Sequence, residues 1–396
     1  MASTDSKCYP LPRGGHVVST EAGLIQFGMP PETIKDSLRA GKPVPSIFVL
    51  LPELFDRRRG LNVSEFEFPS YYHFFLFKRK ATLVVDNADV ERRVREVYRE
   101  TLNGPGFNAA PEEYAIDFPV DARPDHVKES AELFSGKVSI DSLVQFLYFD
   151  PSGRLQMPET SVVIKRDDPT GMYSIEEKGE IIARVPTTLS LPDPIVNVDP
   201  VPPFHPPEFG LTVLGSSHGF DPVGKTTGFV LWLNGHGVLV DPPPESSSVL
   251  LRCGIAPQTI DSVIVSHCHA DHDAGTFQKL LLEGRVSVYT TPHIIGSFVR
   301  KYSALSNLDC ESVRRLFHFR PVTIGAPLRL HGADLHFFYT LHAIPTVGFV
   351  AYFGGKSLAF SADTLYDPAM LREFGHRGVF TEARLQVRMC FVSERG

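Results

Sequence analysis

The spacing of apolar positions over the first 185 residues predicts a mixed α/β region. Aromatic and β-branched residues are concentrated at residues 66–77 and 81–85, which predicts strands with one buried face. From Asp89 onward apolar residues recur at helical spacing, and an Asn-Gly-Pro-Gly turn at residues 103–106 ends that helix. A second short helix is predicted near residues 127–134. Apolar positions predict a third helix, at Ile140, Leu143, Val144 and Leu147.

A proline-dense segment at residues 186–210 separates this region from the rest of the chain. Its prolines are Pro186, Pro192, Pro194, Pro200, Pro202, Pro203, Pro206 and Pro207. Proline lacks the amide donor and fixes φ, so neither a helix nor a sheet can run through such a segment. We therefore expect an N-terminal region at residues 1–185, an extended linker at 186–210 and a second domain at 211–396.

From residue 211 onward, short apolar runs and tight turns predict an α/β sandwich. A hairpin is expected around the Asn-Gly-His-Gly turn at residues 234–237. The predicted strands lie at residues 211–214, 229–233, 238–240, 263–265, 286–289, 335–339, 346–353 and 357–360. The predicted helices lie near residues 274–282, 294–302 and 368–374.

Two familiar motifs occur in an unsuitable context. Residues 219–226 match the phosphate-binding P-loop pattern, and residues 215–219 match the nucleophile elbow of serine hydrolases. Both motifs require a helix directly afterwards. An apolar run at residues 227–233 predicts a strand after the first motif, and a Phe-Asp-Pro turn follows the second. We therefore predict neither a nucleotide-phosphate loop nor a nucleophilic role for Ser217.

The run at residues 267–272 is the main candidate for chemistry. It places three imidazoles and one carboxylate at the end of a predicted strand: His267, His269, Asp271 and His272. In extended chain the first two histidines point to the same side, whereas Cys268 points away. The chain then turns into a helix, for which Asp273 is a candidate N-cap. Burying these groups together is unfavourable without a cation, so we predict a metal site.

This HxHxDH run resembles the signature of the metallo-β-lactamase superfamily. The resemblance covers residues 211–396 and implies an αββα sandwich in which His342 is a further metal ligand and Asp363 is a bridging carboxylate. It also implies that Asp241, at the end of an early strand, supports the ligands from behind. One metal would be held by His267, His269 and His342. The second would be held by Asp271 and His272, and Asp363 would be shared between the two.

The ligand set and the finer likeness imply a metal-dependent hydrolase. Nitrogen and oxygen ligands suit Zn²⁺, with Mn²⁺ or Fe²⁺ as alternatives. Residues 267–276 and 361–364 look like the zinc-hydrolase cyclic-nucleotide phosphodiesterases, whose cyclic-nucleotide-binding modules are not visible here. A metal-bound water, with its pKa lowered to about 7, would act as the nucleophile. The implied catalytic residues are Asp271 and Asp363, and candidate substrate contacts are His218 and Lys225.

Two other functions stay open on the sequence. One is hydrolysis of a thioester or lactone by the same fold, and the other is a weakly active or inactive metal-binding protein. The second follows from a departure at the C-terminus, because the family supplies a final metal histidine after the bridging aspartate. Only His376 follows Asp363, and it comes too soon, after a helical stretch. We therefore expect a C-terminally incomplete domain, since residues 385–396 lack the expected strand and histidine.

Composition limits the partners. The formal net charge of −7 disfavours a nucleic-acid surface, and the basic runs at residues 57–59 and 78–80 are interpreted as solvated faces. Five widely spaced cysteines without a CxxC pair predict no disulfide framework. No apolar run approaches the roughly 20 residues that span a bilayer, and no secretory signal is visible. We expect a cytoplasmic protein that acts on a small molecule, with residues 1–185 serving packing and substrate access.

Overall fold

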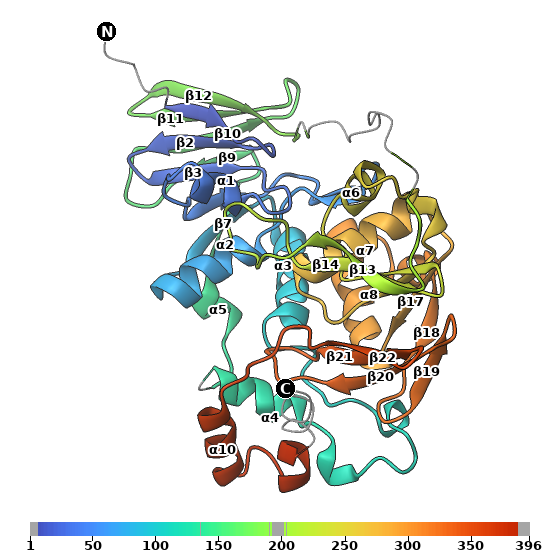
Figure 1. The fold of residues 1–396 in the computed structure, drawn as a ribbon. Helices are drawn as coiled ribbons and strands as arrows, with labels where there is room; N and C mark the ends of the chain where they lie inside the picture. Colours follow the sequence, from blue (N-terminus) through green and yellow to red (C-terminus); the bar gives the residue numbers. More distant parts are fainter. Residues whose placement is uncertain (1–6, 135, 190, 192–201, 203, 387–396) are drawn as a thin grey trace.

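The computed structural model describes residues 7–134, 136–189, 191, 202 and 204–386. The chain forms an N-terminal part with two larger sheets and a C-terminal part with two more (Figure 1). Of the predicted linker at 186–210, residues 190, 192–201 and 203 lie outside the described residues. Residues 387–396, most of the segment expected to lack the final strand and histidine, also lie outside the described residues.

The N-terminal part contains a six-stranded sheet, a four-stranded sheet and a two-stranded hairpin. The first sheet has the order β1 (Cys8–Pro10), β2 (His16–Thr20), β3 (Gly23–Phe27), β4 (Ile47–Val49), β7 (Ala81–Val85) and β8 (Val144–Tyr148). The second has the order β12 (Glu180–Pro186), β11 (Met172–Glu177), β10 (Val163–Asp167) and β9 (Arg154–Gln156). The hairpin pairs β5 (Phe55–Asp56) with β6 (Leu61–Asn62). A buried apolar core joins the two larger sheets, with the rings of Phe27 and Tyr173 5.3 Å apart.

The helices of this part lie mostly between β6 and β8. They are α1 (Ile34–Arg39), α2 (Glu67–Tyr71), the π-helical turn η1 (Tyr72–Leu76), α3 (Ala88–Thr101), α4 (His126–Leu133) and α5 (Ile140–Leu143), with the 3₁₀ turns η2 (Pro111–Glu113) and η3 (Val120–Ala122). The helix predicted after Asp89 is confirmed as α3, and its N-cap Asn87 accepts hydrogen bonds from the amides of Asp89 and Val90. The strand at residues 81–85 and the helix near 127–134 are also confirmed.

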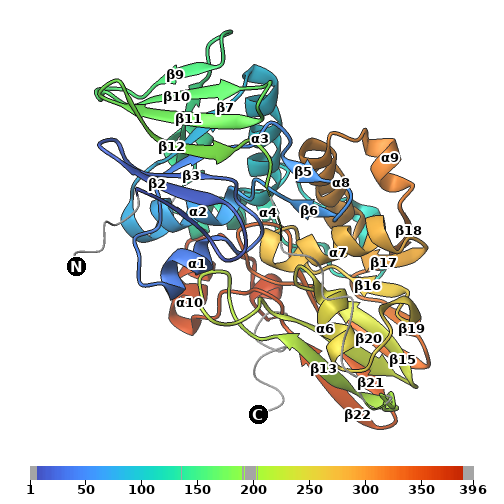
Figure 2. The same ribbon diagram turned by 90° about the horizontal axis from the view of Figure 1, so that it is seen from above.

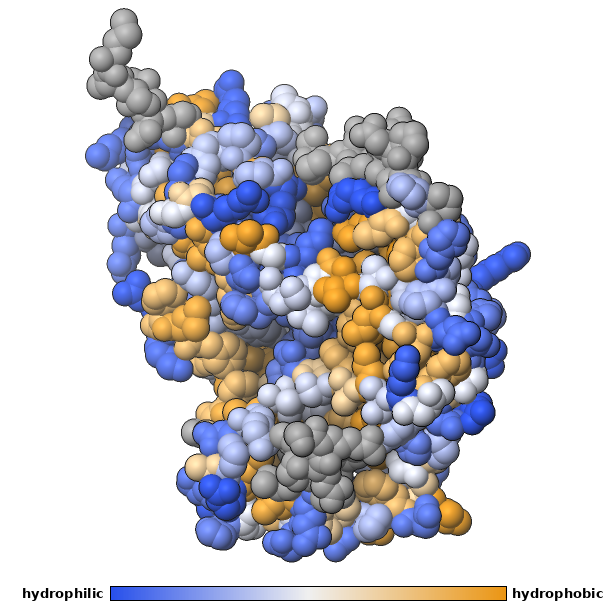
Figure 3. All heavy atoms as spheres, in the orientation of Figure 1, coloured by the Kyte–Doolittle hydropathy of each residue, from blue (hydrophilic) through white to orange (hydrophobic). Residues whose placement is uncertain are grey.

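The strand prediction for residues 66–77 is wrong. These residues form α2 and η1, because their aromatic side chains also recur at helical spacing and pack there, with the rings of Tyr71 and Phe75 5.8 Å apart. Leu76 and Phe77 at the end of the segment are exposed, and a hydrophobic patch is visible over this part of the molecule (Figure 3). The third predicted helix is correct only for Ile140–Leu143, because Val144 starts β8, which pairs with β7.

The C-terminal part contains the strands predicted from residue 211 onward. The larger sheet has the order β13 (Phe209–Gly215), β14 (Gly228–Leu233), β15 (His236–Val240), β16 (Ser262–Ile264), β17 (Val286–Thr290) and β18 (Phe317–Pro321). The smaller has the order β19 (Pro327–Leu330), β20 (Ala333–Tyr339), β21 (Val347–Phe353) and β22 (Lys356–Phe360). The helical elements are α6 (Ser246–Arg252), the 3₁₀ turn η4 (Pro257–Thr259), α7 (Ala270–Leu282), α8 (Pro292–Ser306), α9 (Cys310–Arg314) and α10 (Pro368–His376).

These two sheets pack face to face. The ring of Phe229 on β14 lies 5.1 Å from that of Phe360 on β22, and β20–β22 lie against β13 and β15 in the view from above (Figure 2). Helices α7 and α8 pack on each other through Phe277 and Phe298, and Phe298 also contacts Phe317 of β18. The α/β class and the sandwich expected for this part are confirmed.

The two parts share one buried core. A single apolar cluster includes Val94 and Tyr98 of α3 together with Phe298 of α8. Beside it, the guanidinium of Arg300 donates to both carboxylate oxygens of Glu100, at 2.6 and 2.9 Å. No helix in the described ranges is long and apolar enough to cross a membrane. No disulfide joins the cysteines of the described part, Cys8, Cys253, Cys268 and Cys310.

Candidate metal centre

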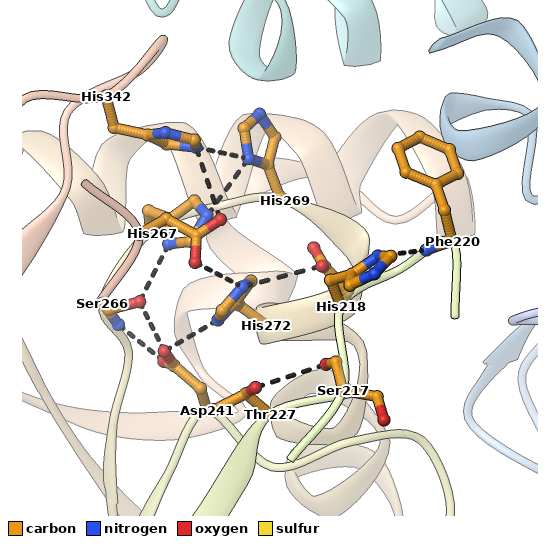
Figure 4. Close-up of polar contacts among 12 residues, drawn as sticks. Ser217, His218, Phe220, Thr227, Asp241, Ser266, His267, His269, His272 and His342 are labelled. Atoms are coloured by element: carbon orange, nitrogen blue, oxygen red, sulfur yellow. Dashed lines mark hydrogen bonds and ion pairs between the residues drawn. The ribbon is translucent and has the colours of Figure 1, made fainter. Parts of the chain in front are cut away.

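Asp241 and the predicted ligands lie beyond the ends of four strands, and two of the ligands, Asp271 and His272, lie in the first turn of α7. Asp241 follows β15 and His267 follows β16, and these strands are parallel neighbours, so their carboxyl ends meet at one edge. His342 follows β20 and Asp363 follows β22. Both of these strands are antiparallel to β21 and therefore run in the same direction. The face-to-face sheets bring the four loops together (Figure 4).

Three histidines form the first group of ligand atoms. The Nε2 of His267 lies 3.1 Å from the Nδ1 of His269, which lies 3.0 Å from the Nε2 of His342. These nitrogens are close enough to hold one metal ion. His267 is fully buried, whereas the other two are half-buried.

The hydrogen bonds on the far side of each ring show which ring nitrogens carry a proton. The Nε2–H of His269 donates to the main-chain carbonyl of Thr101 at 2.8 Å. The Nδ1–H of His267 donates to the hydroxyl of Ser266 at 2.8 Å, and that hydroxyl donates in turn to Asp241. The facing nitrogens of His267 and His269 therefore carry lone pairs, which repel each other unless a cation lies between them. The donor set fits a divalent metal ion.

His272 and two carboxylates form a second group. The Nε2 of His272 lies 3.4 Å from Oδ1 of Asp363 and 3.7 Å from Oδ2 of Asp271. The other carboxylate oxygen of Asp363 lies 3.9 Å from the Nε2 of His342. The two oxygens of Asp363 thus face the two histidine groups, which is the geometry that a shared carboxylate requires.

Asp241 lies behind both groups. Its carboxylate accepts hydrogen bonds from the amide of Ser266 at 2.8 Å, from the Ser266 hydroxyl, and from the Nδ1–H of His272 at 3.0 Å. With its oxygens used in this way, it orients His272 and, through Ser266, His267. Its loop is tightly enclosed, because a Cβ on Gly275 would lie 2.1 Å from the carbonyl oxygen of Pro242. Only glycine fits there.

The pKa values in the cluster follow from burial and from mutual charge. Burial lowers the pKa of His267 and His269 well below the usual value and that of His342 to about 4, so these imidazoles are neutral. Burial also opposes the charged form of His272, but Asp271, Asp241 and Asp363 outweigh it and raise its pKa. Burial likewise opposes ionisation of Asp363, but the hydrogen bond and charge of His272 hold its pKa well below the usual range.

Three residues near the motif are placed differently from the ligands. The N-cap prediction for Asp273 is wrong, because α7 starts at Ala270 and the buried carboxylate instead accepts from Lys301 at 3.1 Å and Tyr302 at 2.8 Å. Cys268 points away from the imidazoles, with its sulfur 3.5 Å from the carbonyl of Ile294. His376 is exposed at the end of α10 and, within the described part of the chain, belongs to neither ligand group.

The two candidate substrate contacts lie on the loop between β13 and β14. His218 is exposed beside the ligands, and its Nδ1 accepts from the amide of Phe220 at 3.2 Å (Figure 4). The ammonium of Lys225 lies 3.4 Å from the carbonyl of Pro244 and lines a pocket with Arg13 and Glu245. Strand β14 follows this loop directly, which confirms the strand predicted after the P-loop-like motif.

Several known proteins are similar in sequence to this chain. Residues 209–390 match the family model described as Anti-Pycsar protein Apyc1. The cGMP-dependent 3′,5′-cGMP phosphodiesterase A of Dictyostelium discoideum is 35% identical over 501 residues, covering 95% of this chain and 58% of its own length. The cAMP/cGMP-dependent 3′,5′-cAMP/cGMP phosphodiesterase B of the same organism is 30% identical, covering 93% of this chain and 38% of its own. Over almost its whole length, this chain is similar in sequence to these two phosphodiesterases.

The resemblance expected from the motif is thereby confirmed. The family model starts at residue 209, whereas the alignments with the two phosphodiesterases also include the N-terminal part. The chain spans 58% and 38% of those two relatives. Among solved structures, the metallo-β-lactamase fold protein YhfI from Bacillus subtilis is 21% identical over 41% of this chain and 65% of its own, with a TM-score of 0.33.

Sequence reasoning missed the residues that support the ligands from behind. Ser266 directly precedes His267, so a polar residue at the end of a buried strand could have drawn attention to it. The hydroxyl of Thr340 donates to the main-chain carbonyl of Asp363 at 2.9 Å and so holds the loop that carries this carboxylate. Thr101 and Tyr71 reach His269 only through tertiary contact, and no pattern along the chain indicates this.

Proposed function

We propose that this protein is a zinc-dependent phosphodiesterase that hydrolyses 3′,5′-cyclic nucleotides. The observation that carries the proposal is the position of Asp363, whose two oxygens face His342 on one side and His272 on the other. Two adjacent metal positions suit phosphodiester hydrolysis, since both the attacking and the leaving oxygen need stabilisation. The names of the two Dictyostelium relatives support cGMP or cAMP as the substrate.

In this proposal, three imidazoles hold the first zinc ion, namely those of His267, His269 and His342. Asp271 and His272 hold the second, and Asp363 is shared. Bound zinc supplies an activated water and neutralises charge that develops on the phosphoryl group. The supporting hydrogen bonds of Ser266 and Asp241 keep the imidazoles in the tautomer and orientation that ligation requires.

His218 is proposed to contact the phosphate. Because its Nδ1 accepts from the amide of Phe220, its proton is on Nε2, which can donate to a phosphoryl oxygen. Lys225 is the weaker candidate, since its ammonium is directed to the Pro244 carbonyl. We further propose that the protein acts in the cytoplasm on small molecules.

A substrate panel tests the proposal. Zinc-loaded protein would be assayed on cGMP, cAMP, bis(p-nitrophenyl) phosphate, a thioester and a lactone, with Asp363→Asn as the matched inactive control. We expect hydrolysis of the cyclic nucleotides that is lost in the control. Preferential hydrolysis of the thioester or lactone would replace the proposal with the alternative hydrolase function. No turnover of any compound would favour a non-catalytic metal-binding protein.

A further inference from the structure

We infer that residues 67–104 of the N-terminal part are a structural component of the metal centre, with Thr101 and Tyr71 as positioning residues for His269. The inference rests on the metal site of the proposed function but not on its substrate. It gives the N-terminal part a role that the metal-binding motif alone does not indicate.

The carbonyl of Thr101 is available because of the local sequence. Helix α3 ends at Thr101, so this carbonyl is among the last ones of the helix. Its next partner along a continued helix would be the amide of residue 105, which is Pro105 and has no N–H. The carbonyl accepts instead from the Nε2–H of His269 at 2.8 Å. This bond leaves the lone pair on Nδ1, the atom that faces His267 and His342.

Tyr71 restrains the same imidazole from another direction. Its ring is 6.2 Å from that of His269, in an edge-to-face arrangement with an interplanar angle of 71°. Its hydroxyl lies 2.9 Å from the hydroxyl of Thr101, so one side chain contacts both the ligand and the residue that fixes the ligand. Tyr71 is itself buried, with Tyr98 of α3 packed 6.4 Å away.

A buried ion-pair network supports the loop that carries His267 and His269. The ammonium of Lys301 donates to the carbonyl of Cys268 at 2.8 Å and to Asp273 at 3.1 Å. It also pairs with Glu67 of α2, 3.0 Å away. All three charged side chains are almost fully buried. Removing one member of a buried ion pair strongly destabilises the folded protein, because the remaining charge is left without a partner. The N-terminal part therefore supplies one of the two carboxylates that balance Lys301.

The N-terminal part also contacts the loop of His342. Gly104, which has a φ of +73°, packs so closely that a Cβ there would be 3.0 Å from Cδ of Pro345. Residues 67–104 thus touch both loops that provide the three-histidine site. Losing such a supporting partner typically lowers metal affinity by roughly 10–100-fold.

Three variants test this inference through metal binding. Tyr71→Leu removes both the ring beside His269 and the hydroxyl near Thr101, Tyr71→Phe keeps the ring, and Tyr98→Phe is the control. Tyr98 is buried in the same cluster, but its hydroxyl bonds to Ser70 and Phe66. Zinc affinity would be measured by competition with a chromophoric chelator, ligand geometry by the absorption spectrum of the Co²⁺-loaded protein, and folding by circular dichroism and thermal unfolding.

We expect Tyr71→Leu to weaken zinc binding by about tenfold or more and to change the Co²⁺ spectrum. The zinc affinity of Tyr71→Phe should lie between those of Tyr71→Leu and the wild type, and the zinc affinity of Tyr98→Phe should equal that of the wild type. A folded Tyr71→Leu protein with wild-type affinity and spectrum would overturn the inference, as would a wild-type protein that binds no zinc. If Tyr71→Leu does not fold, Tyr71→Phe decides the matter, because a zinc affinity below that of the wild type supports the inference and a wild-type affinity overturns it. Normal zinc binding without any phosphodiesterase activity would contradict the proposed function only.

Discussion

The two halves of the metal centre are held in different ways. In the three-histidine half, His267 and His269 each donate to a neutral oxygen, and burial keeps the imidazoles uncharged. In the other half a single imidazole, that of His272, faces three carboxylates, and the side chain of Asp363 is 46% exposed. The first half presents neutral imidazole lone pairs to a metal ion. The second half collects carboxylates, whose negative charge a metal ion would neutralise.

This difference has a thermodynamic consequence. Neutral buried imidazoles need not lose a proton before they bind a metal ion, whereas His272 is protonated when it lies among carboxylates without one. Metal binding at the second half must displace that proton. We therefore expect the two halves to fill in sequence, with the three-histidine half first.

The largest effect is expected when the first half is removed. Changing His267 and His269 together to alanine should abolish tight metal binding, because only His342 would remain of the three ligands. Elemental analysis of purified protein would measure this, with the exposed His236→Ala as the control. Retention of all bound metal by the double variant would disprove the assignment.

Removing the shared carboxylate should have the next largest effect. Asp363→Ala should reduce turnover of a cyclic nucleotide by on the order of a hundredfold or more, because one group serves both halves. Lys225→Ala should cost only a few-fold, on the order of one surface charge contact. Steady-state kinetics would compare the two variants, and equal losses would argue against a bridging role.

Calorimetric titration of zinc into metal-free protein compares the halves directly. We expect two steps, with the second weaker by roughly tenfold or more, the size of effect seen when ligand support is incomplete. The second half has one imidazole among the described residues, and His376 does not contribute another. Two tight steps of equal affinity would show that a further ligand completes the second half.

Asp241→Asn should act unequally on the two halves. Asp241 contacts His272 directly but reaches His267 only through Ser266. We expect the second zinc affinity to fall by about 10–100-fold and the first to fall less. The same titration measures both steps. A larger loss of zinc affinity at the first step than at the second would contradict this prediction.

A further effect, on stability rather than on metal binding, is expected at Glu65, which lines a pocket with Asp271. Burial raises the pKa of Glu65 from 4.5 to about 8, so the folded protein binds a proton that the unfolded chain releases from about pH 4.5 upward. Glu65 therefore reduces stability progressively as pH rises from about 4.5 to 8. Glu65→Gln should raise the melting temperature at pH 9 but hardly change it at pH 4. An equal shift at both values would contradict this origin.

Sequence patterns predicted the C-terminal strands well, and they predicted that His267, His269 and His342 lie close together, for different physical reasons. Strands such as β14 are apolar runs bounded by turn residues, and the turn between β14 and β15 places Asn234 and Gly235 at positive φ. The ligand residues follow strand ends in a short motif, so their spacing alone is informative. The strand prediction fails at residues 66–77, because aromatic residues favour strands on average but here pack against Tyr98 and Phe220 as helical turns.

The contacts behind the ligands could not be predicted in the same way. The bond from His269 to Thr101 joins residues 168 positions apart, and it depends on how α3 docks beside α8. Likewise, nothing in the sequence distinguishes Lys301 from the other lysines. Only the fold shows that it is buried between Glu67 and Asp273. Such contacts arise from packing between distant segments, for which a single sequence holds no periodic signal.

One ion in the three-histidine site would bind the larger sheet to the smaller, because His267 follows β16 and His342 follows β20. It would act as a cross-link that closes the long stretch of chain between them. Any ion that binds only the folded chain adds RT ln(1 + [M]/Kd) to its stability, about 2.7 kcal/mol at a free concentration a hundred times the Kd. The melting temperature would then rise with the free zinc concentration. A chelator would lower it by removing the link between the two sheets at the edge where they meet.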